Sequence, residues 1–164
     1  MPKPKRNTND VEHLSDYFSD IDEWPNDWMA VEEDLEIGRG LLTLFIPYVK
    51  HLIDERLARK TIKNNGYHLK MLGGEIIERL NQADEDNRKL SPRELILHYV
   101  HEEGGPLLSF LDPNVKAELA QHMAYDATCR KLLKFVKLES RTGYAARGAA
   151  PHPGIFAQKN GTIG

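Results

Sequence analysis

Residues 60–81 read KTIKNNGYHLKMLGGEIIERLN, and the interpretation of the whole chain starts from this stretch. Apolar side chains recur along it with the three- and four-residue spacing of one helix face, which predicts a helix from about residue 60 to residue 81. That face holds Ile62, Leu69, Leu72, Ile76 and Leu80. The pair Gly73 and Gly74 lies within the pattern, and each glycine costs a helix about 1 kcal/mol relative to alanine. The two adjacent glycines therefore indicate either the close approach of another helix or a break in this one.

Helical patterns continue on both sides of this stretch. Residues 36–57 carry an apolar face broad enough to imply burial on more than one side. Further along, Ser91–Pro92 and Asp112–Pro113 each place a capping residue before a proline, which predicts a helix start at both positions. Residues 10–36 predict a short helix that Pro25 interrupts. Because no segment has a convincing strand pattern, the sequence predicts an all-α fold, a single orthogonal bundle of five or six helices with flexible tails at both ends.

Composition divides the 164 residues into three parts. Residues 1–9 are polar and basic and predict a flexible arm, and residues 10–139 predict the helical domain. Residues 140–164 are rich in glycine, alanine and proline and predict a disordered tail. The alternative for this tail is a docking peptide for a protein partner.

Localisation is inferred from three features of the sequence. No apolar run is long enough for a transmembrane helix. The basic N-terminus lacks the apolar stretch of a secretory signal. The single cysteine, Cys129, cannot form an internal disulfide. We therefore expect a cytoplasmic protein with no membrane partner.

Charge is distributed unevenly behind a net value of −3. Residues 10–36 contain eleven acidic residues and no lysine or arginine, whereas residues 37–72 carry seven basic residues against two acidic ones, and residues 128–164 carry seven against one. Two basic segments on one face could bind a phosphate backbone, because local potential matters more than net charge. The candidate nucleic-acid-binding cations are Arg56, Arg59, Lys60, Lys63, Lys70, Arg130, Lys131, Lys134 and Lys137. The alternative is that these side chains only solvate helix faces.

The acidic segment 10–36 also contains both tryptophans of the chain. Large aromatic side chains are used mostly for burial, so one interpretation is a brace that packs on the helical core. The other is an acidic, aromatic peptide that mimics phosphate or docks on a basic partner. The candidate protein-interaction residues of that second interpretation are Trp24, Trp28, Glu32, Glu33 and Asp34.

Catalytic motifs are missing from the sequence. It contains neither a P-loop nor a complete dinucleotide-binding glycine motif, and Cys129 lacks a neighbouring thiol or a group that would stabilise a thiolate. Glu94, His98 and His101 fall at i, i+4 and i+7 on one predicted helix face, a spacing with which a carboxylate and two imidazoles can hold a transition metal. The same pattern also describes the wet face of an amphipathic helix. We expect no enzyme activity, no metal and no cofactor.

Residues 44–49 and 57–69 resemble the N-terminal core-binding, SAM-like helical domain of tyrosine recombinases, the phage integrases. In that family an aromatic-rich helix ends at a leucine, a short link containing threonine and isoleucine follows, and a basic helix begins. The matching positions here are Phe45, Tyr48, Leu57, Thr61 and Ile62. The resemblance implies a helical fold and contact with DNA through Arg59, Lys60, Thr61, Lys63 and Lys70.

The chain departs from this family in three ways. Ala58 stands where the family often has a capping serine, and the pair Gly73–Gly74 is unusual for the domain. The recombinase catalytic domain is missing, and no His-x-x-Arg sequence occurs. The first hypothesis is therefore a non-enzymatic nucleic-acid-binding accessory module. The alternative is a protein-interaction or regulatory protein, encoded on a mobile element, that uses residues 10–36.

Overall fold

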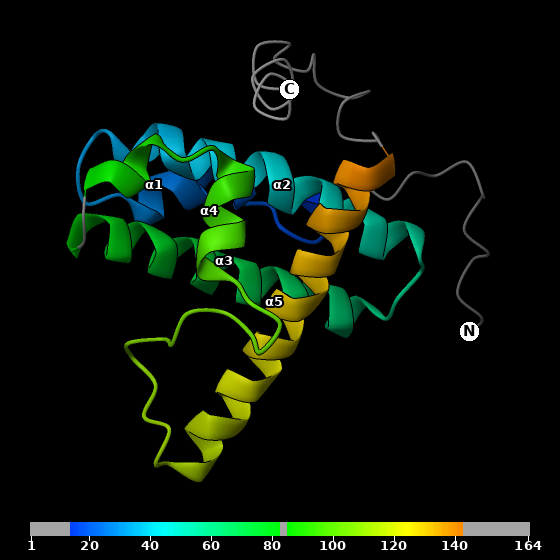
Figure 1. The fold of residues 1–164 in the computed structure, drawn as a ribbon. Coiled ribbons are helices and arrows are strands. Elements are labelled where there is room, and N and C mark those ends of the chain that lie inside the picture. Colours follow the sequence, from blue (N-terminus) through cyan, green and yellow to red (C-terminus); the bar gives the residue numbers. More distant parts are fainter. Residues whose placement is uncertain (1–13, 83–84, 143–164) are drawn as a thin grey trace, which may run out of the picture. The chain divides into compact units, whose positions relative to one another are not determined.

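The fold is all-α, as the sequence predicts (Figure 1). The computed structural model describes residues 14–82 and 85–142, and these ranges contain no β-strand. The α-helices are α1 (Trp24–Trp28), α2 (Asp34–Asp54), α3 (Arg59–Gln82), α4 (Pro92–Tyr99) and α5 (Lys116–Thr142). Short 3-10 helices lie at Leu14–Asp16, Ile21–Glu23 and Glu85–Lys89. The predicted basic arm and most of the predicted C-terminal tail lie outside the described residues.

The chain divides into two compact units, residues 1–133 and residues 134–164. Helix α5 runs through the boundary, and the packing described below belongs to the first unit. There α2 and α3 lie side by side, and α4 packs against α2 (Figure 1). The predicted boundary of the helical domain, residue 139, stays a prediction.

Helix α3 contributes a long buried face to the core. Its apolar face is fully buried at Leu69, Leu72 and Ile76. The polar Asn65 is buried in the same face, where its side-chain oxygen accepts a hydrogen bond of 2.9 Å from the Tyr48 hydroxyl of α2. This pairing satisfies two polar groups that would otherwise be costly to bury. The register of α2 against α3 is therefore set by a specific hydrogen bond as well as by apolar packing.

The glycines of α3 are seats for aromatic rings. A Cβ atom on Gly66 would lie 2.0 Å from the Phe18 ring, and one on Gly73 would lie 2.3 Å from the Trp28 ring. Both distances are far below van der Waals contact, so only glycine fits at these positions. Helix α3 continues through the Gly73–Gly74 pair without a break. Of the two alternatives for these glycines, close approach is confirmed, and a residue of α1 makes it.

The N-terminal ends of α4 and α1 test two of the sequence predictions. Ser91 caps α4, because its side-chain oxygen accepts the Glu94 backbone N–H at 3.2 Å, and Pro92 begins the helix. The expectation for Pro25 is wrong: this proline does not interrupt a helix but occupies the first turn of α1. The N–H of a residue in the first turn has no acceptor within the helix, so a proline, which lacks this N–H, loses no hydrogen bond there and starts a helix at little cost.

Candidate nucleic-acid interface

The turn between α2 and α3 places positive charge at the start of a helix. Arg56 has a φ of 58°, in the left-handed region, and its N–H donates to the Ile53 carbonyl at 2.9 Å. Helix α3 then begins at Arg59, and its first turn contains no acidic residue. Helix N-termini carry a partial positive charge that acidic residues usually balance. Here basic side chains stand in the first turn of α3 in place of acidic ones.

Four side chains form an outward-facing surface on the first half of α3, which we name the α3 strip. They are Lys60, Lys63, Asn64 and Tyr67. The spacing of three and four residues keeps them on one side of the helix, and Tyr67 is 60% exposed. Among the described residues, no carboxylate lies within ion-pair distance of Lys60 or Lys63. The strip therefore offers two ammonium groups and an aromatic ring to a ligand.

Arg59 and Lys70, two other predicted nucleic-acid contacts, have partners within the protein. The Arg59 guanidinium donates to the Asp16 backbone oxygen at 2.7 Å and lies 4.8 Å from the centre of the Tyr17 ring, a cation–π geometry. Lys70 lies 3.2 Å from Asp27 and 3.6 Å from Asp20. Both cations therefore fasten residues 14–28 to α3, and Asp20 and Asp27 partly balance the charge of Lys70.

Thr61 does not belong to the α3 strip. Its residue is half-buried on the side of α3 that turns toward the core, and its backbone oxygen accepts the Asn65 amide at 2.8 Å. The position of Thr61 fits a role in packing the start of the helix. The DNA contact implied by the resemblance stays a prediction for this residue.

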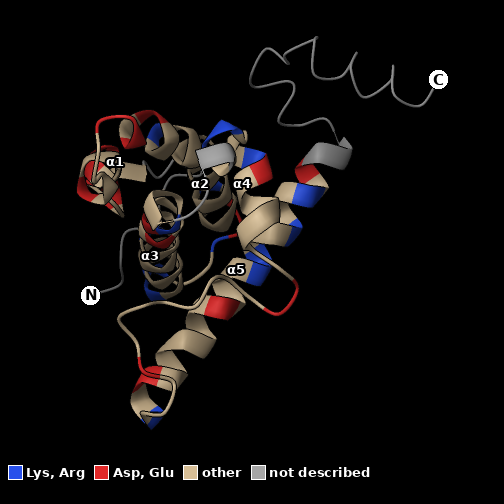
Figure 2. Cartoon of the chain, turned by 60° about the vertical axis from the view of Figure 1, so that its left-hand side comes forward, with Lys and Arg blue, Asp and Glu red and all other residues tan. Residues whose placement is uncertain are grey.

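The second basic segment lies on α5. Arg130 and Lys131 are exposed in the first unit, and Arg130 donates to the Glu103 backbone oxygen at 3.1 Å. Lys134 and Lys137 are exposed as well, but they belong to the second unit. Figure 2 shows basic residues along this part of α5 and at the start of α3. That the two basic segments share one face stays a prediction.

Residues 14–34, which we name the brace, pack onto α2 and α3 through aromatic side chains. Adjacent rings along the brace lie 5.8 Å apart from Phe18 to Trp24 and 6.0 Å apart from Trp24 to Trp28, and the Trp28 ring meets Phe45 of α2 at 6.2 Å. The Trp28 indole N–H also donates to the Lys70 carbonyl at 2.8 Å. Such tilted and edge-on ring pairs combine a large buried area with specific geometry. The brace is thus part of the core.

Asp34 is the polar centre of the brace. Its fully buried carboxylate accepts hydrogen bonds from the backbone N–H groups of Ala30 and Val31, from the Asn81 amide and from the Arg88 guanidinium, all at 2.9 to 3.0 Å. Burial by itself raises the pKa of this carboxyl group, but these donors outweigh burial and the pKa of Asp34 is lowered. One carboxylate thereby joins the brace, the end of α3 and the segment before α4.

This placement corrects the predicted protein-interaction site. Trp24 and Asp34 are buried, so neither offers a surface to a partner, whereas Trp28 is half-buried against α3 and α2. Sequence reasoning placed them there because acidic and aromatic residues together are typical of docking peptides. Glu32 and Glu33 are exposed, and contact of these two residues with a partner stays a prediction.

A cleft of about 440 Å³ opens on the second half of α3. Trp28, Met71, Gly74 and Phe110 give it apolar walls, and Glu75 and Glu78 give it carboxylates. Both carboxylates have partners within the fold, since Glu75 lies 3.2 Å from the Arg79 guanidinium and Glu78 accepts from Gln82 at 3.2 Å. The cleft therefore combines apolar walls with carboxylates that are already engaged.

A histidine and an aspartate on α5 form a pair that the sequence interpretation missed. The His122 Nδ1 lies 3.0 Å from Asp126, and its Nε2 accepts the Leu108 backbone N–H at 3.1 Å. Asp126 also accepts the Gly105 N–H at 3.0 Å. A histidine that serves as a general base needs one nitrogen directed at a substrate proton. Here Nε2 holds the loop before α5 through Leu108 and Nδ1 is engaged with Asp126 on α5, and the i, i+4 spacing of His122 and Asp126 was the available signal.

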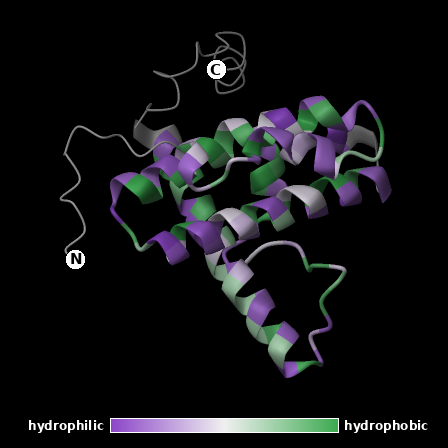
Figure 3. Ribbon diagram, turned by 180° about the vertical axis from the view of Figure 1, so that it is seen from behind, coloured by the Kyte–Doolittle hydropathy of each residue, from purple (hydrophilic) through white to green (hydrophobic). Residues whose placement is uncertain are grey.

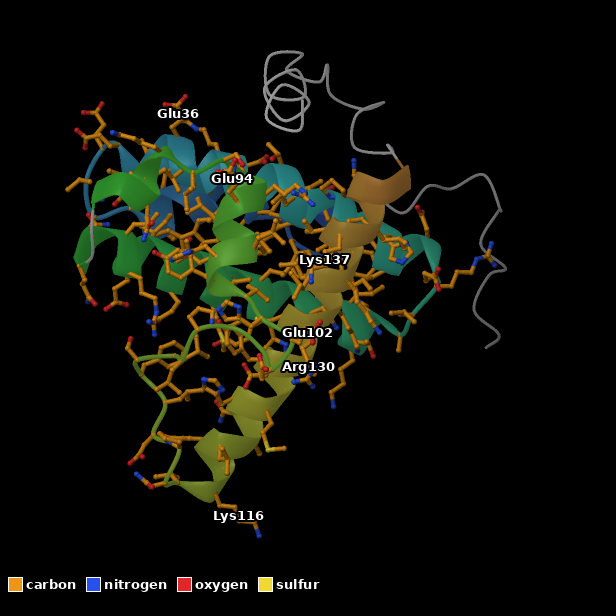
Figure 4. The ribbon with its side chains drawn as sticks, in the orientation of Figure 1. Glu36, Glu94, Glu102, Lys116, Arg130 and Lys137 are labelled. Carbon is orange, nitrogen blue, oxygen red and sulfur yellow. The ribbon has the colours of Figure 1, made fainter. Side chains whose placement is uncertain are left out.

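Other groups with catalytic potential are buried. Burial raises the pKa of the Cys129 thiol to about 12, which keeps it protonated and unreactive at neutral pH. In the described part of the chain, no three His, Cys, Asp or Glu side chains lie together in a group that could hold a metal ion. Glu94, His98 and His101 are among the residues searched, and Figure 4 shows Glu94 on α4.

Comparisons with known proteins add no family. No protein-family model, no curated protein and no solved structure matches the chain. Within the described ranges, none of the helices has the length and apolar character needed to cross a bilayer.

Proposed function

We propose that this protein is a non-enzymatic nucleic-acid-binding accessory module that contacts the phosphate backbone through the start of α3. The observation that carries the proposal is the α3 strip: Lys60 and Lys63 are exposed without an internal counter-ion, next to a helix N-terminus that has no acidic residue. Phosphate contacts from lysine and helix N-termini position a protein on a duplex. Tyr67 supplies an exposed ring beside them.

The proposed site contains fewer cations than the sequence predicted. Arg59 and Lys70 are engaged with the brace, so Lys60, Lys63 and Arg56 supply the charge that a phosphate meets first. The resemblance to the core-binding domain of phage integrases points to the same helix start, and it remains part of the proposal. So does a role in a mobile element.

The backbone of Arg56 supports a function for this side chain. Glycine is the usual residue at a left-handed position after a helix, because a Cβ atom there costs roughly 1 kcal/mol. An arginine in this position carries that cost while adding a cation beside the start of α3. Strained residues that persist in a fold point to a functional requirement.

A titration of labelled duplex DNA, read by fluorescence anisotropy, tests the proposal. Lys60→Glu with Lys63→Glu removes two phosphate contacts, so we expect much weaker binding and a shallower dependence of the remaining affinity on salt, by about 0.9 in the log–log slope for each contact. Arg39→Glu reverses the charge of one exposed cation on α2 and serves as the charge-reversal control. Equal binding by the native chain and the double variant would remove the proposal, as would an equal loss with Arg39→Glu.

Arg56→Gly separates binding from folding. The change relieves the left-handed strain, so we expect thermal unfolding to show a stability gain of about 1 kcal/mol. The same change removes a cation from the site, so DNA affinity should fall. A variant that is stabilised and binds as tightly as the native chain would take Arg56 out of the site.

The alternative function, protein interaction through the acidic segment, has less support from the geometry. Of its five predicted residues only Glu32 and Glu33 are exposed. Nucleic-acid binding therefore comes first among the two hypotheses.

A further inference from the structure

One side of α3 carries both the α3 strip and the cleft on the second half of the helix. Because about 3.6 residues complete one helical turn, positions four and seven residues apart return to nearly the same side. Lys63, Tyr67 and Gly74 follow this spacing, and α3 is continuous across them. Lys63 and Tyr67 belong to the strip, whereas Gly74 lines the cleft. A ligand that lies along α3 therefore meets the strip first and the cleft next.

The character of α3 changes along its length. Hydrophilic residues dominate its first turns, whereas hydrophobic residues become more frequent in its second half (Figure 3). From Lys63 to Gly74 the helix rises about 16 Å, at about 1.5 Å for each residue. This length accommodates a few extended nucleotides, with the charged groups of the strip at one end and the apolar walls of the cleft at the other.

Tyr67 presents its ring to solvent between the lysines and the cleft. The residue is 60% exposed, and Lys63 lies one turn before it on the same side of the helix. A base of any type stacks on such a ring with its flat face. In a duplex the neighbouring base pairs cover these flat faces. The Tyr67 ring therefore finds a stacking partner only where the bases are unpaired.

The cleft beyond Tyr67 has the size and the walls to receive a flat ring. Its volume is about 440 Å³, and Trp28, Met71 and Phe110 line it. Clefts of this volume with aromatic and aliphatic walls are typical of sites for small organic groups. At its edge the Lys70 ammonium lies 3.2 Å from the Asp27 carboxylate, so this cation is already balanced. The cleft is therefore suited to an uncharged ring more than to a phosphate.

The carboxylates of the cleft favour the same orientation of a nucleotide. Glu75 and Glu78 repel a phosphate, so the charged backbone stays at the lysines of the strip while the uncharged base enters the cleft. The Ser109 hydroxyl lies 3.5 Å from Glu75 and 3.4 Å from Glu78, and its single proton can serve only one of them. Because a carboxylate offers about four lone-pair sites, lone pairs remain for the amino group of a base edge.

We propose that this side of α3 binds single-stranded nucleic acid in preference to a duplex. Lys60 and Lys63 hold the phosphates, Tyr67 stacks on one base, and the cleft takes up a neighbouring base of the same strand. The inference rests on the proposed function, nucleic-acid binding through the start of α3, and deepens it by naming the form of nucleic acid that the site accepts. Positive charge beside a stacking ring is the combination that single-strand-binding proteins use.

Fluorescence anisotropy with one labelled oligonucleotide tests the preference. The full chain is titrated against a mixed-sequence strand of about 12 nucleotides and against the same strand annealed to its complement. We expect the single strand to bind about 10-fold more tightly at equal salt concentration, because stacking adds to the phosphate contacts. A duplex that binds as tightly as the single strand, or more tightly, would overturn the inference.

The two lysines separate a failure of this inference from a failure of the proposed function. Lys60→Glu with Lys63→Glu should weaken the binding of both oligonucleotides. If the double variant binds both of them like the native chain, the proposed function fails and this inference fails with it. If the double variant loses affinity for both but the native chain shows no preference for the single strand, only this inference fails.

Tyr67→Ala tests the stacking of a base on the ring. We expect the affinity for the single strand to fall about 10-fold and the affinity for the duplex to stay unchanged. Tyr67→Phe keeps the ring and should bind like the native chain. Met123→Ala is the matched control, because Met123 is 62% exposed and lies on another helix. Unchanged single-strand binding by Tyr67→Ala, or an equal loss with Met123→Ala, would contradict the stacking.

Phe110→Ala removes one wall of the cleft and tests its role as a base site. We expect the affinity for the single strand to fall about 5-fold, again without a change for the duplex. Leu107→Ala is the matched control, since Leu107 is exposed near Phe110 in the same loop but does not line the cleft. Circular dichroism checks that both variants keep the helix content of the native chain. Equal single-strand affinities of the two variants would overturn the assignment of the cleft.

Discussion

The brace and residues 107–124, which we name the arm, use similar residues with opposite outcomes. Both contain acidic side chains beside large apolar ones, yet the brace buries Trp24 and Phe18 whereas the arm leaves Phe110 and Met123 more than 60% exposed. The difference lies in what each segment meets. Glycines on α3 provide seats for the rings of the brace, whereas the described chain offers Phe110 and Met123 no comparable cover. Burial is therefore decided by the receiving surface as much as by the apolar residue itself.

Replacement of Asp34, the polar centre of the brace, should have the largest effect on the free energy of unfolding. Asp34→Ala leaves the partly buried Arg88 guanidinium and two backbone N–H groups without their acceptor, so we expect a loss of about 3–5 kcal/mol in unfolding free energy. Chemical denaturation followed by circular dichroism measures this loss. Glu33→Ala, an exposed neighbour, should stay within about 0.5 kcal/mol of the native chain. Similar losses for the two variants would mean that the brace is no more integrated than an ordinary surface segment.

The close contact between the Trp28 ring and the glycines of α3 tests the same comparison with a smaller expected effect on stability. Gly73→Ala forces a Cβ atom against the Trp28 ring at 2.3 Å, so we expect a destabilisation of about 1–3 kcal/mol. A Cβ atom on Gly74 would lie 3.3 Å from the same ring. There the helix-forming gain of alanine, about 1 kcal/mol, offsets much of the crowding. Thermal melts of the two single variants should therefore differ clearly. Equal melting temperatures would contradict the close packing of the Trp28 ring on Gly73.

The contact between His68 of α3 and Thr128 of α5 should produce the smallest effect, a dependence of the unfolding free energy on pH. His68 lies 2.7 Å from the Thr128 hydroxyl of α5, and burial lowers its pKa below the ordinary value of 6.5. The unfolded chain therefore binds a proton more readily than the folded chain, and stability falls as pH drops below about 6.5. Denaturation midpoints at pH 7.5 and pH 5.5 measure the fall. His68→Gln should reduce it, and an unchanged pH dependence in that variant would assign the effect to other groups.

Local sequence patterns located α2, α3 and α4 but not the partners of these helices, and they placed a helix start at Asp112–Pro113 whereas α5 begins at Lys116. The spacing of Leu69, Leu72 and Ile76 predicts α3, and Ser91–Pro92 predicts the start of α4, because both signals act within one or two turns of the chain. The role of Pro25 was missed because the same residue can interrupt a helix or start one, and the choice depends on where neighbouring backbone groups find hydrogen bonds.

The candidate site was predicted in outline only. The absence of acidic residues between positions 56 and 70 pointed to the start of α3, but sequence alone gave Arg59 and Lys70 the same standing as Lys60 and Lys63. Contacts with Asp16 and Asp27, more than 40 positions away along the chain, separate the two pairs. The ion pairs of Lys70 with the brace depend on the fold and have no local signature.

The sequence by itself determined the all-α class, the position of α3 and the polarity of each segment, because helix formation and charge are local properties of the chain. Only the tertiary structure decided that Trp24 and Asp34 are core residues and that Phe110 and Met123 are exposed. Burial depends on which distant surface reaches a side chain first. In this protein glycines on α3 receive the brace, while Met123 of α5 stays exposed in the described part of the chain.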